Sequence, residues 1–257
     1  MITCGIDGGS RTIKVALFDQ TAGRVVATGS RDQGLAQERL ALDLRDAVAV
    51  DAGVDPAGIT ATVATGYARR LLRTATRQIT EITCHAAGVA HVFPQAGSVI
   101  EIGGQDAKAI ALEEGGRVRD FVMNDRCAAG TGRFLELVAV HLEVDLSDLA
   151  SVLEAAANLD PVTISSMCVV FAETEIVGLL ATGVPAPAIM IGVQRAVAER
   201  IAAMAGRLLR DPVVLTGGVA LIAGMDRALA ERLQRPVTCC PQALYTGAIG
   251  AALLAGS

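Results

Sequence analysis

The sequence predicts an α/β protein built from two similar halves with a cleft between them, and three observations support this fold class. Its 257 residues are 52% hydrophobic and 19% charged, which provides enough apolar material for a sizeable core. Residues 5–18 (GIDGGSRTIKVALF) and 99–112 (VIEIGGQDAKAIAL) repeat one pattern of strand, acid, glycine turn and strand. In each half, strand-like segments come first and helix-like segments follow.

Short apolar runs bounded by turn residues predict the strands, and longer runs with helical spacing predict the helices. The clearest helix carries Val193, Val197, Ile201, Met204 and Leu208 at helical spacing, with charged residues between them. The predicted strands lie near 2–6, 13–19, 24–29, 61–65, 98–102, 107–112, 117–122, 213–216 and 236–239. The predicted helices lie near 35–52, 81–92, 130–142, 147–157, 168–182, 187–209, 225–233 and 246–254.

The internal repeat sets the expected domain organisation. An offset of 94 residues places Asp7 on Glu101 and Lys14 on Lys108, and both copies run on to a Gly-Arg-Val sequence. Duplication of such a hairpin predicts two similar subdomains, residues 1–95 and 96–257. We expect the small-residue helix 246–254 to be able to pack back on the first subdomain.

Composition excludes several classes of function. The net charge is −5 with no basic patch or tail, so nucleic acid is not an expected partner. The longest apolar stretch, 176–193, is interrupted by glycine and proline and does not predict a membrane span. Met1 leads directly into a strand-like segment without a signal peptide, which predicts a cytoplasmic protein. The six cysteines are then core residues, metal ligands or redox groups rather than a disulfide framework.

The first hairpin, DGGSRT, is typical of a site for magnesium and a triphosphate. Backbone amides at Gly8 and Gly9 are open to a ligand because no side chain blocks them. The predicted ligand-binding set of this hairpin is Gly8, Gly9, Ser10, Arg11, Thr12 and Lys14. Asp7 is expected to hold Mg²⁺ through water, and Lys14 to bring a positive charge to the β-phosphate.

The second hairpin repeats this arrangement from the opposite side. It begins at Glu101, and its predicted binding residues are Gly103, Gly104, Gln105 and Asp106. A third glycine pair, Gly217 and Gly218, follows the strand-like run 212–216. No Walker A or GxGxxG motif is present. Hydrolysis requires a positioned water, and Asp7 or Glu101 is the predicted group that orients it.

These three blocks resemble the superfamily of actin, sugar kinases and heat-shock chaperone ATPases. Residues 7–14 match its first phosphate motif, residues 101–106 the second, and residues 215–220 the adenosine motif. The resemblance implies a duplicated fold of two subdomains with ATP or ADP and Mg²⁺ bound in the cleft between them.

Two cysteines lie in matched settings, Cys127 in NDRCAAGTGRFLE (124–136) and Cys168 in TISSMCVVFAETE (163–175). Cys127 lies just before one predicted helix and Cys168 at the start of another, with Ser165 and Ser166 as expected caps of the second, and a helix start stabilises thiolate. A [4Fe–4S] cluster needs four thiolates, so a twofold dimer could share one cluster. A zinc site and buried structural cysteines remain open as alternatives. Gly130 and Gly132 would let the first of these helices approach the nucleotide.

The two cysteine segments resemble the signatures of the 2-hydroxyacyl-CoA dehydratase activators, which share the BadF/BadG/BcrA/BcrD family with ATPase subunits of benzoyl-CoA reductase. ATGYARR (64–70), EITCHAAG (81–88), IGGQDAK (102–108) and YTGAIGAALLA (245–255) match that family in the same order. The resemblance implies a homodimer with one [4Fe–4S] cluster bound by Cys127 and Cys168. It also implies ATP-driven transfer of one electron from reduced ferredoxin or flavodoxin to an acyl-CoA dehydratase or reductase component.

The chain departs from the family pattern at three positions: Glu101 replaces the usual Asp, Ala68 replaces Gly, and Arg11 stands where Thr is common. Three alternatives remain: a permanent subunit of benzoyl-CoA reductase, a redox-silent sugar or acid kinase, and a nucleotide-binding regulatory protein with a structural metal. Cys4, Cys239, Cys240 and the adjacent Cys84 and His85 are interpreted as structural residues.

Overall fold

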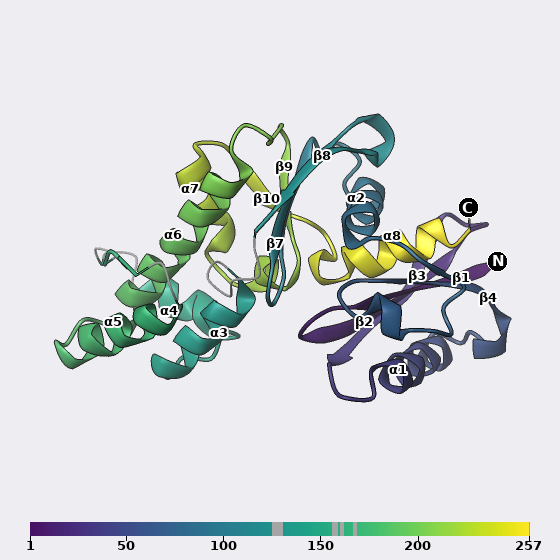
Figure 1. Ribbon diagram of the computed structural model, residues 1–257, viewed down its shortest axis with the longest axis horizontal. Helices are drawn as coiled ribbons and strands as arrows, with labels where there is room; N and C mark the ends of the chain where they lie inside the picture. Colours follow the sequence, from purple (N-terminus) through teal and green to yellow (C-terminus); the bar gives the residue numbers. More distant parts are fainter. Residues whose placement is uncertain (125–130, 156–158, 160–161, 167–168, 257) are drawn as a thin grey trace.

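The computed structural model describes residues 1–124, 131–155, 159, 162–166 and 169–256, and its architecture is two sheets of the same topology (Figure 1). The first sheet has the order β3-β2-β1-β4-β5 and the second has the order β10-β9-β6-β7-β8. The strands of the first sheet are β1 (Ile2–Gly8), β2 (Thr12–Asp19), β3 (Arg24–Asp32), β4 (Ile59–Thr65) and β5 (Arg77–Gln78). Those of the second are β6 (Ser98–Ile102), β7 (Ala107–Leu112), β8 (Val118–Met123), β9 (Val213–Thr216) and β10 (Val237–Cys239).

The two sheets also share their register. In the first, β1 pairs antiparallel with β2 so that Asp7 lies opposite Lys14. In the second, β6 pairs antiparallel with β7 so that Glu101 lies opposite Lys108. In both, the first strand of the sheet also pairs in parallel with a later strand, β4 or β9. The predicted duplicated fold is therefore confirmed at the level of individual residue pairs.

The helices are close to those that the sequence predicts. They are α1 (Gln37–Asp51), α2 (Glu81–Val92), α3 (Gly132–His141), α4 (Leu149–Ala155), α5 (Val169–Ala181), α6 (Ala186–Ala205), α7 (Met225–Leu233) and α8 (Thr246–Leu254). The prediction that the sixth helix reaches residue 209 is wrong. Gly206 ends it with a φ of 52°, a left-handed value that suits glycine, and Leu208 therefore lies beyond the helix. Within the described part of the chain, none of the helices is long and apolar enough to cross a membrane.

Each sheet is covered on both faces (Figure 1). The side chains of Ile100 and Ile102 pack with α6 and α7 on one face of the second sheet, whereas Val99 and Ile110 pack with α2 on the other. The first sheet has α1 on one face and α8 on the other. Alternate residues of a strand point to opposite faces, which explains how such short strands serve two cores.

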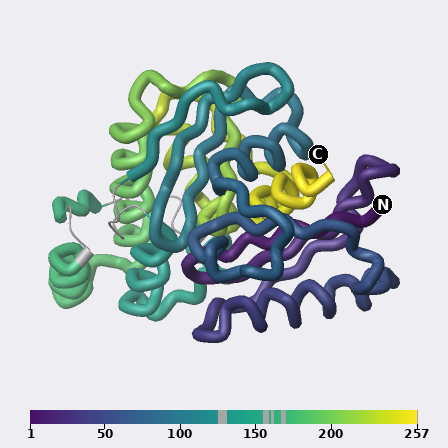
Figure 2. Tube along the Cα trace, turned by 45° about the vertical axis from the view of Figure 1, so that its right-hand side comes forward, coloured from purple at the N-terminus to yellow at the C-terminus, as the bar shows by residue number. Residues whose placement is uncertain are grey.

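Helices α2 and α8 form the layer between the sheets, and glycines allow them to touch. A Cβ at Gly88 would collide with the backbone carbonyl of Thr246, and one at Gly250 would collide with the carbonyl of Cys84. Figure 2 shows α8, in yellow, against the purple strands of the first sheet. Thus α2 follows the first sheet in sequence but packs on the second, and α8 follows the second sheet but packs on the first.

Candidate active site

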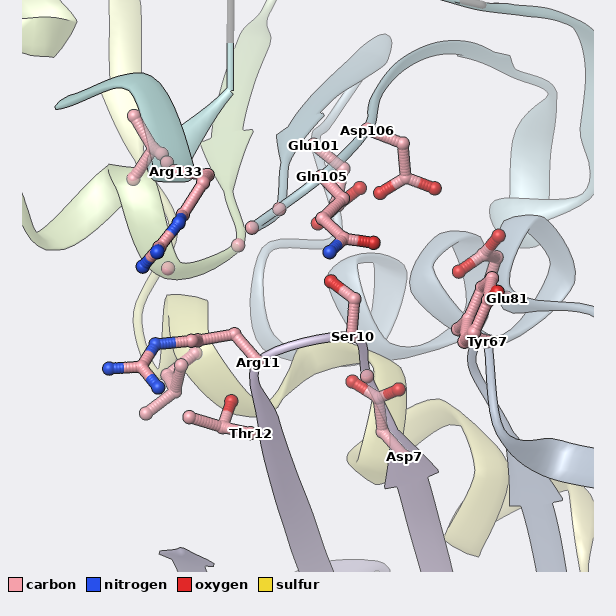
Figure 3. Close-up of a pocket in the computed structure, with 18 of the residues that line it drawn as sticks. Asp7, Ser10, Arg11, Thr12, Tyr67, Glu81, Glu101, Gln105, Asp106 and Arg133 are labelled. Carbon is pink, nitrogen blue, oxygen red and sulfur yellow. The ribbon is translucent and has the colours of Figure 1, made fainter. Parts of the chain in front are cut away.

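A cavity of about 960 Å³ lies where the hairpin turns of the two sheets face each other, and most predicted site residues line it. Figure 3 shows Asp7 and Ser10 on one side and Glu101, Gln105 and Asp106 on the other. The predicted residues along the wall are Asp7, Gly9, Ser10, Arg11, Thr12, Lys14, Glu101, Gly103, Gly104, Gln105, Asp106, Gly132, Gly217 and Gly218. Gly8 lies instead beneath the surface, where its carbonyl accepts a 2.7 Å hydrogen bond from the amide of Ala68.

The two hairpin turns have the same geometry. The amide of Gly9 donates to the carbonyl of Thr12 at 3.1 Å, and the amide of Gly103 donates to the carbonyl of Asp106 at 2.9 Å. The turns approach so closely that a Cβ at Gly104 would lie 3.1 Å from the Cβ of Arg11. Within the described residues, the amides of Ser10 and Gly104 donate no hydrogen bond, and they remain available to an anionic ligand.

Each sheet contributes one buried acid and one lysine. Lys14 Nζ lies 3.2 Å from Asp7 Oδ2, and Lys108 Nζ lies 2.8 Å from Glu101 Oε2. Burial is the largest single influence and opposes ionisation of both acids, but the neighbouring positive groups, led by Lys14 for Asp7 and by Lys108 for Glu101, together hold each pKa below its usual value. Both carboxylates are therefore charged at neutral pH.

Lys108 is the centre of a larger cluster. Its side chain is 1% exposed, and its Nζ also lies 3.0 Å from Asp106 Oδ2 and 3.5 Å from Glu81 Oε2. Burial alone would lower the pKa of Lys108, but Glu101 and the other two carboxylates raise it. The pKa of Glu81 is raised, mainly by its own burial.

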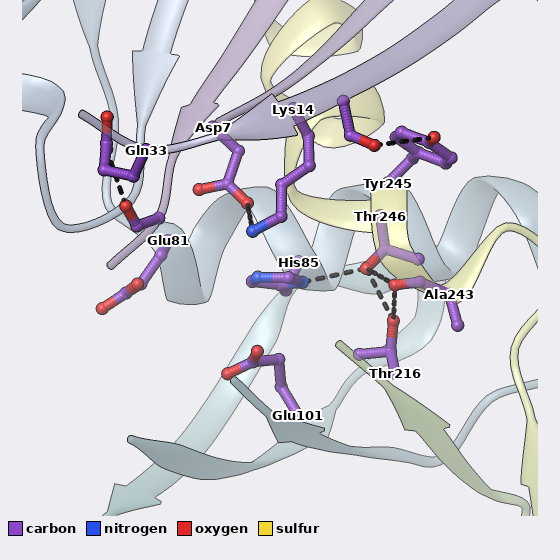
Figure 4. Close-up of polar contacts among 12 residues, drawn as sticks. Asp7, Lys14, Gln33, Glu81, His85, Glu101, Thr216, Ala243, Tyr245 and Thr246 are labelled. Atoms are coloured by element: carbon purple, nitrogen blue, oxygen red, sulfur yellow. Dashed lines mark hydrogen bonds and ion pairs between the residues drawn. The ribbon is translucent and has the colours of Figure 1, made fainter. Parts of the chain in front are cut away.

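A buried hydrogen-bonded chain crosses the floor of the cavity (Figure 4). His85 Nδ1 lies 2.9 Å from Thr246 Oγ1, which lies 2.7 Å from Thr216 Oγ1. Thr216 donates to the carbonyl of Ala243 at 2.8 Å. Burial lowers the pKa of His85, although Glu101 and Asp7 oppose this, so the imidazole is neutral. The chain joins α2, β9 and α8 at the point where both sheets meet the cavity.

The third glycine pair completes the wall. Gly217 has a φ of 89°, and a Cβ there would lie 2.7 Å from Glu101 Oε1. A side chain at this position would therefore be strained and would displace the acid. Nothing lies within 4 Å of the position of a Cβ at Gly218, which faces open space. The glycine-lined wall, the free amides and the paired acids fit a magnesium-bound triphosphate.

Helix α3 is tied to the second hairpin by its first turn. The amides of Gly132 and Arg133 donate to the carbonyls of Gly103 and Gly104 at 2.8 and 3.0 Å. Across the mouth of the cavity, Arg11 Nε lies 3.3 Å from Glu136 Oε1 on the same helix. Both hairpins therefore contact α3, which begins shortly after the Cys127 segment in the sequence.

The predicted cluster ligands Cys127 and Cys168, together with Gly130, lie outside the described residues. Helix α5 begins at Val169, directly after Cys168 in sequence, as the sequence predicts within one residue. The amides of Ser165 and Ser166 donate to the two carboxylate oxygens of Glu175 at 2.8 and 2.9 Å, an interaction that the predicted capping role did not include. No cluster of three or more metal-ligating side chains occurs within the described residues.

The sequence predicts structural roles for the four cysteines outside the two cluster segments, and three of the four are buried. Cys4, Cys84 and Cys240 are buried, and burial raises the pKa of each thiol to about 12. Cys239 is exposed.

Sequence reasoning missed three residues of the site: Glu81, His85 and Lys108. The sequence does point to Lys108, because the internal repeat aligns it with Lys14, which belongs to the predicted binding set. Glu81 and His85 lie in the family-like segment 81–88, but that segment alone does not show their partners, which come from other elements.

Comparison with known proteins agrees with this geometry. The family model described as the BadF/BadG/BcrA/BcrD ATPase family matches residues 4–255. The chain is 45% identical to the activator of lactoyl-CoA dehydratase from Anaerotignum propionicum, over 99% of this chain and 97% of that protein. The activator of 2-hydroxyisocaproyl-CoA dehydratase from Clostridium difficile, solved with bound ADPNP, has a TM-score of 0.91 and 36% identity over 99% of this chain and 94% of its own. One of the subunits of benzoyl-CoA reductase from Thauera aromatica is 32% identical over 98% of this chain and 92% of its own length.

Proposed function

Because the chain belongs to the BadF/BadG/BcrA/BcrD ATPase family, we propose that it is an ATPase that activates an (R)-2-hydroxyacyl-CoA dehydratase by delivering one low-potential electron. The similarity to named dehydratase activators favours this function over a role within benzoyl-CoA reductase, because the identity is 45% in the first case and 32% in the second. The observation that carries the proposal is the pair of opposed hairpins around one cavity, with α3 hydrogen-bonded to one of them.

The nucleotide part of the proposal rests on the cavity wall. ATP would lie between the hairpins, where the amides of Ser10 and Gly104 face its phosphates and Lys14 neutralises charge. Asp7 would hold Mg²⁺ through water, because a single carboxylate suits an ion that keeps most of its hydration shell. Gly218, with nothing within 4 Å of the position of a Cβ, leaves room for the adenosine end.

The electron-transfer part rests on α3 and α5. We propose that Cys127 and Cys168 of two protomers hold one [4Fe–4S] cluster, which when bound supplies a one-electron carrier. The amides of Gly132 and Arg133 connect the start of α3 to the second hairpin. Relative motion of the two sheets on nucleotide turnover would therefore move the helix that follows Cys127. Reduced ferredoxin or flavodoxin is the proposed electron donor.

The homodimer is supported by an uncovered apolar surface. Four large apolar side chains of α3 and α5 are between 49% and 75% exposed, and they are Val140, Val170, Phe171 and Val177. Such a group is expected at an interface rather than in water. Since α5 starts directly after Cys168, a twofold contact through this helix would bring the cysteines of both protomers together.

Anaerobic purification with iron and sulfide analysis tests the proposal. We expect about four irons per dimer, the content of one cluster. Cys127→Ala should abolish the cluster and electron transfer but retain nucleotide binding. Cys239→Ala, at an exposed cysteine away from these helices, is the matched control and should retain the cluster. An iron-free, active monomer that phosphorylates a sugar would instead support the kinase alternative.

The assembly distinguishes the remaining alternative. A free activator should elute as a dimer in size-exclusion chromatography and stimulate an added dehydratase component. A permanent component of benzoyl-CoA reductase should copurify with catalytic subunits in fixed proportion when expressed in its native host.

A further inference from the structure

The distances along the chain of hydrogen bonds on the cavity floor favour one direction. The carbonyl of Ala243 can only accept, and Thr216 at 2.8 Å is a nearer donor than Thr246 at 3.4 Å. With Thr216 donating its single proton to this carbonyl, which also accepts from the amide of Gly217 at 3.1 Å, Thr246 is the donor in the 2.7 Å contact between the hydroxyls. Thr246 then has no proton left for the imidazole, so Nδ1 of His85 must donate to it at 2.9 Å.

This direction fixes the tautomer of His85. A neutral imidazole with its proton on Nδ1 carries a bare lone pair on Nε2. Burial lowers the pKa of the ring and supports the neutral form. Nε2 has no hydrogen-bond partner within the described residues, and His85 belongs to the cavity wall. The imidazole therefore offers an unused acceptor to the cavity.

The lone pair lies at the centre of the site. Figure 4 shows the His85 ring between the carboxylates of Asp7 and Glu101. A Cβ at Gly247 would lie 3.0 Å from His85 Nε2 and 3.3 Å from Asp7 Oδ2, so both atoms adjoin the same small space. The absence of a side chain at 247 keeps the imidazole accessible.

Each of the two acids is already bonded to a lysine through one of its oxygens. Asp7 Oδ2 is bonded to Lys14, and its Oδ1 lies against Gly66. Glu101 Oε2 is bonded to Lys108. Charge on both acids is already neutralised by lysines, whereas His85 Nε2 has no such partner within the described residues.

We propose that His85 Nε2 accepts a hydrogen bond from the water that attacks the γ-phosphate of ATP, with Thr246 and Thr216 as positioning residues that hold its tautomer. This inference rests on the proposed ATPase function and refines which group orients the water. The water oxygen forms a bond to the γ-phosphorus, and the bond from that phosphorus to the β,γ-bridging oxygen breaks. The electron pair of that bond leaves on ADP. One water proton stays on the phosphate, and the other passes to solvent by way of Nε2.

Substitution of His85 provides the first test, with ADP release and ATP affinity measured separately. His85→Ala should lower kcat by about 10²–10⁴-fold, the usual contribution of a positioned proton acceptor, and change the Kd for ATP by less than about threefold. His85→Gln, whose side-chain oxygen can also accept a hydrogen bond, should recover part of the rate. His91→Ala, on the same helix, is the matched control and should keep the kcat of the unaltered protein.

The positioning role of Thr246 is tested by a second pair. Thr246→Val removes the acceptor of the Nδ1 proton at nearly constant volume and should lower kcat while the Kd for ATP stays unchanged. Thr246→Ser keeps the hydroxyl and should restore the rate. Equal rates for the valine and serine variants would show that the hydrogen bonds through Thr246 do not set the orientation of His85.

Spectroscopy of the unaltered protein tests the tautomer even if a variant fails to fold. In ¹⁵N NMR of histidine-labelled protein, His85 should show a protonated Nδ1 and an unprotonated Nε2. The opposite tautomer, or full activity in His85→Ala, would overturn the inference. If the unaltered protein neither binds nor hydrolyses ATP, the proposed function itself is wrong.

Discussion

Replacing Lys108 with methionine should destabilise the protein by about 3–5 kcal/mol at neutral pH, the usual cost of breaking a buried ion pair on one side. The Lys108 side chain is 1% exposed, and its closest partner is Glu101, whose side chain is 6% exposed. Two unit charges 4 Å apart interact by about 4 kcal/mol at an effective dielectric constant near 20. Asp106 and Glu81, with side chains 33% and 23% exposed, are partly solvated and add less.

The loss should also depend on pH. In the unaltered protein the folded-state pKa of Glu101 is depressed, so its contribution is present above the unfolded pKa and is lost as pH falls through the folded pKa. Without Lys108, burial raises the folded pKa of Glu101 above its unfolded value. In the variant, the contribution of Glu101 to stability is then most favourable below its unfolded pKa and becomes less favourable as pH rises. The difference between the two proteins should therefore shrink towards acid.

Urea unfolding of the nucleotide-free protein at several pH values between 5 and 8 measures both effects. Arg39→Met is the control, because Arg39 and Asp43 form an ion pair with side chains 83% and 56% exposed. It should change the free energy of unfolding by less than about 1 kcal/mol. A Lys108→Met protein as stable as the unaltered one, or equally destabilised at every pH, would refute the electrostatic account of this cluster.

Three further predictions concern the packing and the exposed groups. Gly250→Ala should lower the free energy of unfolding by at least about 1–3 kcal/mol, because the methyl group would force α2 and α8 apart. Gly178→Ala is the control, because nothing lies within 4 Å of the position of its Cβ, and it should be neutral or stabilising; urea unfolding compares the two variants. A maleimide should label exposed Cys239 before buried Cys84, as followed by mass spectrometry, and equal rates would contradict the burial. Glu136→Gln removes the ion pair with the first hairpin and should change the free energy of unfolding by less than about 1 kcal/mol, since both partners are partly exposed.

The fold could be predicted from sequence because its determinants are local and repeated. The pairs Asp7–Lys14 and Glu101–Lys108 are seven residues apart in each copy, and the hairpin puts them opposite each other. Strand β5 was not predicted, because it has two exposed residues, Arg77 and Gln78, and depends only on pairing with β4. No apolar pattern marks such a strand.

The candidate site was predictable to the extent that it lies on those hairpins. The glycines and acids that line the cavity belong to short motifs, and each motif indicates phosphate or Mg²⁺ binding from its own few residues. The sequence alone predicts only packing for His85, and its partner Thr246 is 161 residues away. Whether a buried polar side chain is structural or points into a cavity depends on which distant element supplies its other neighbours.

The placement of α2 and α8 has a consequence for synthesis of the chain on the ribosome. The face of the first sheet that includes Ala16 and Phe18 is covered by α8. This face stays uncovered during synthesis until α8 is translated, after the entire second sheet. Conversely, α2 is translated early, but the strands on which it packs, β6, β7 and β9, are translated later. A nascent amino-terminal half therefore carries a bare apolar face and an undocked helix, so it is a natural client for chaperones and a poor candidate for expression as a fragment.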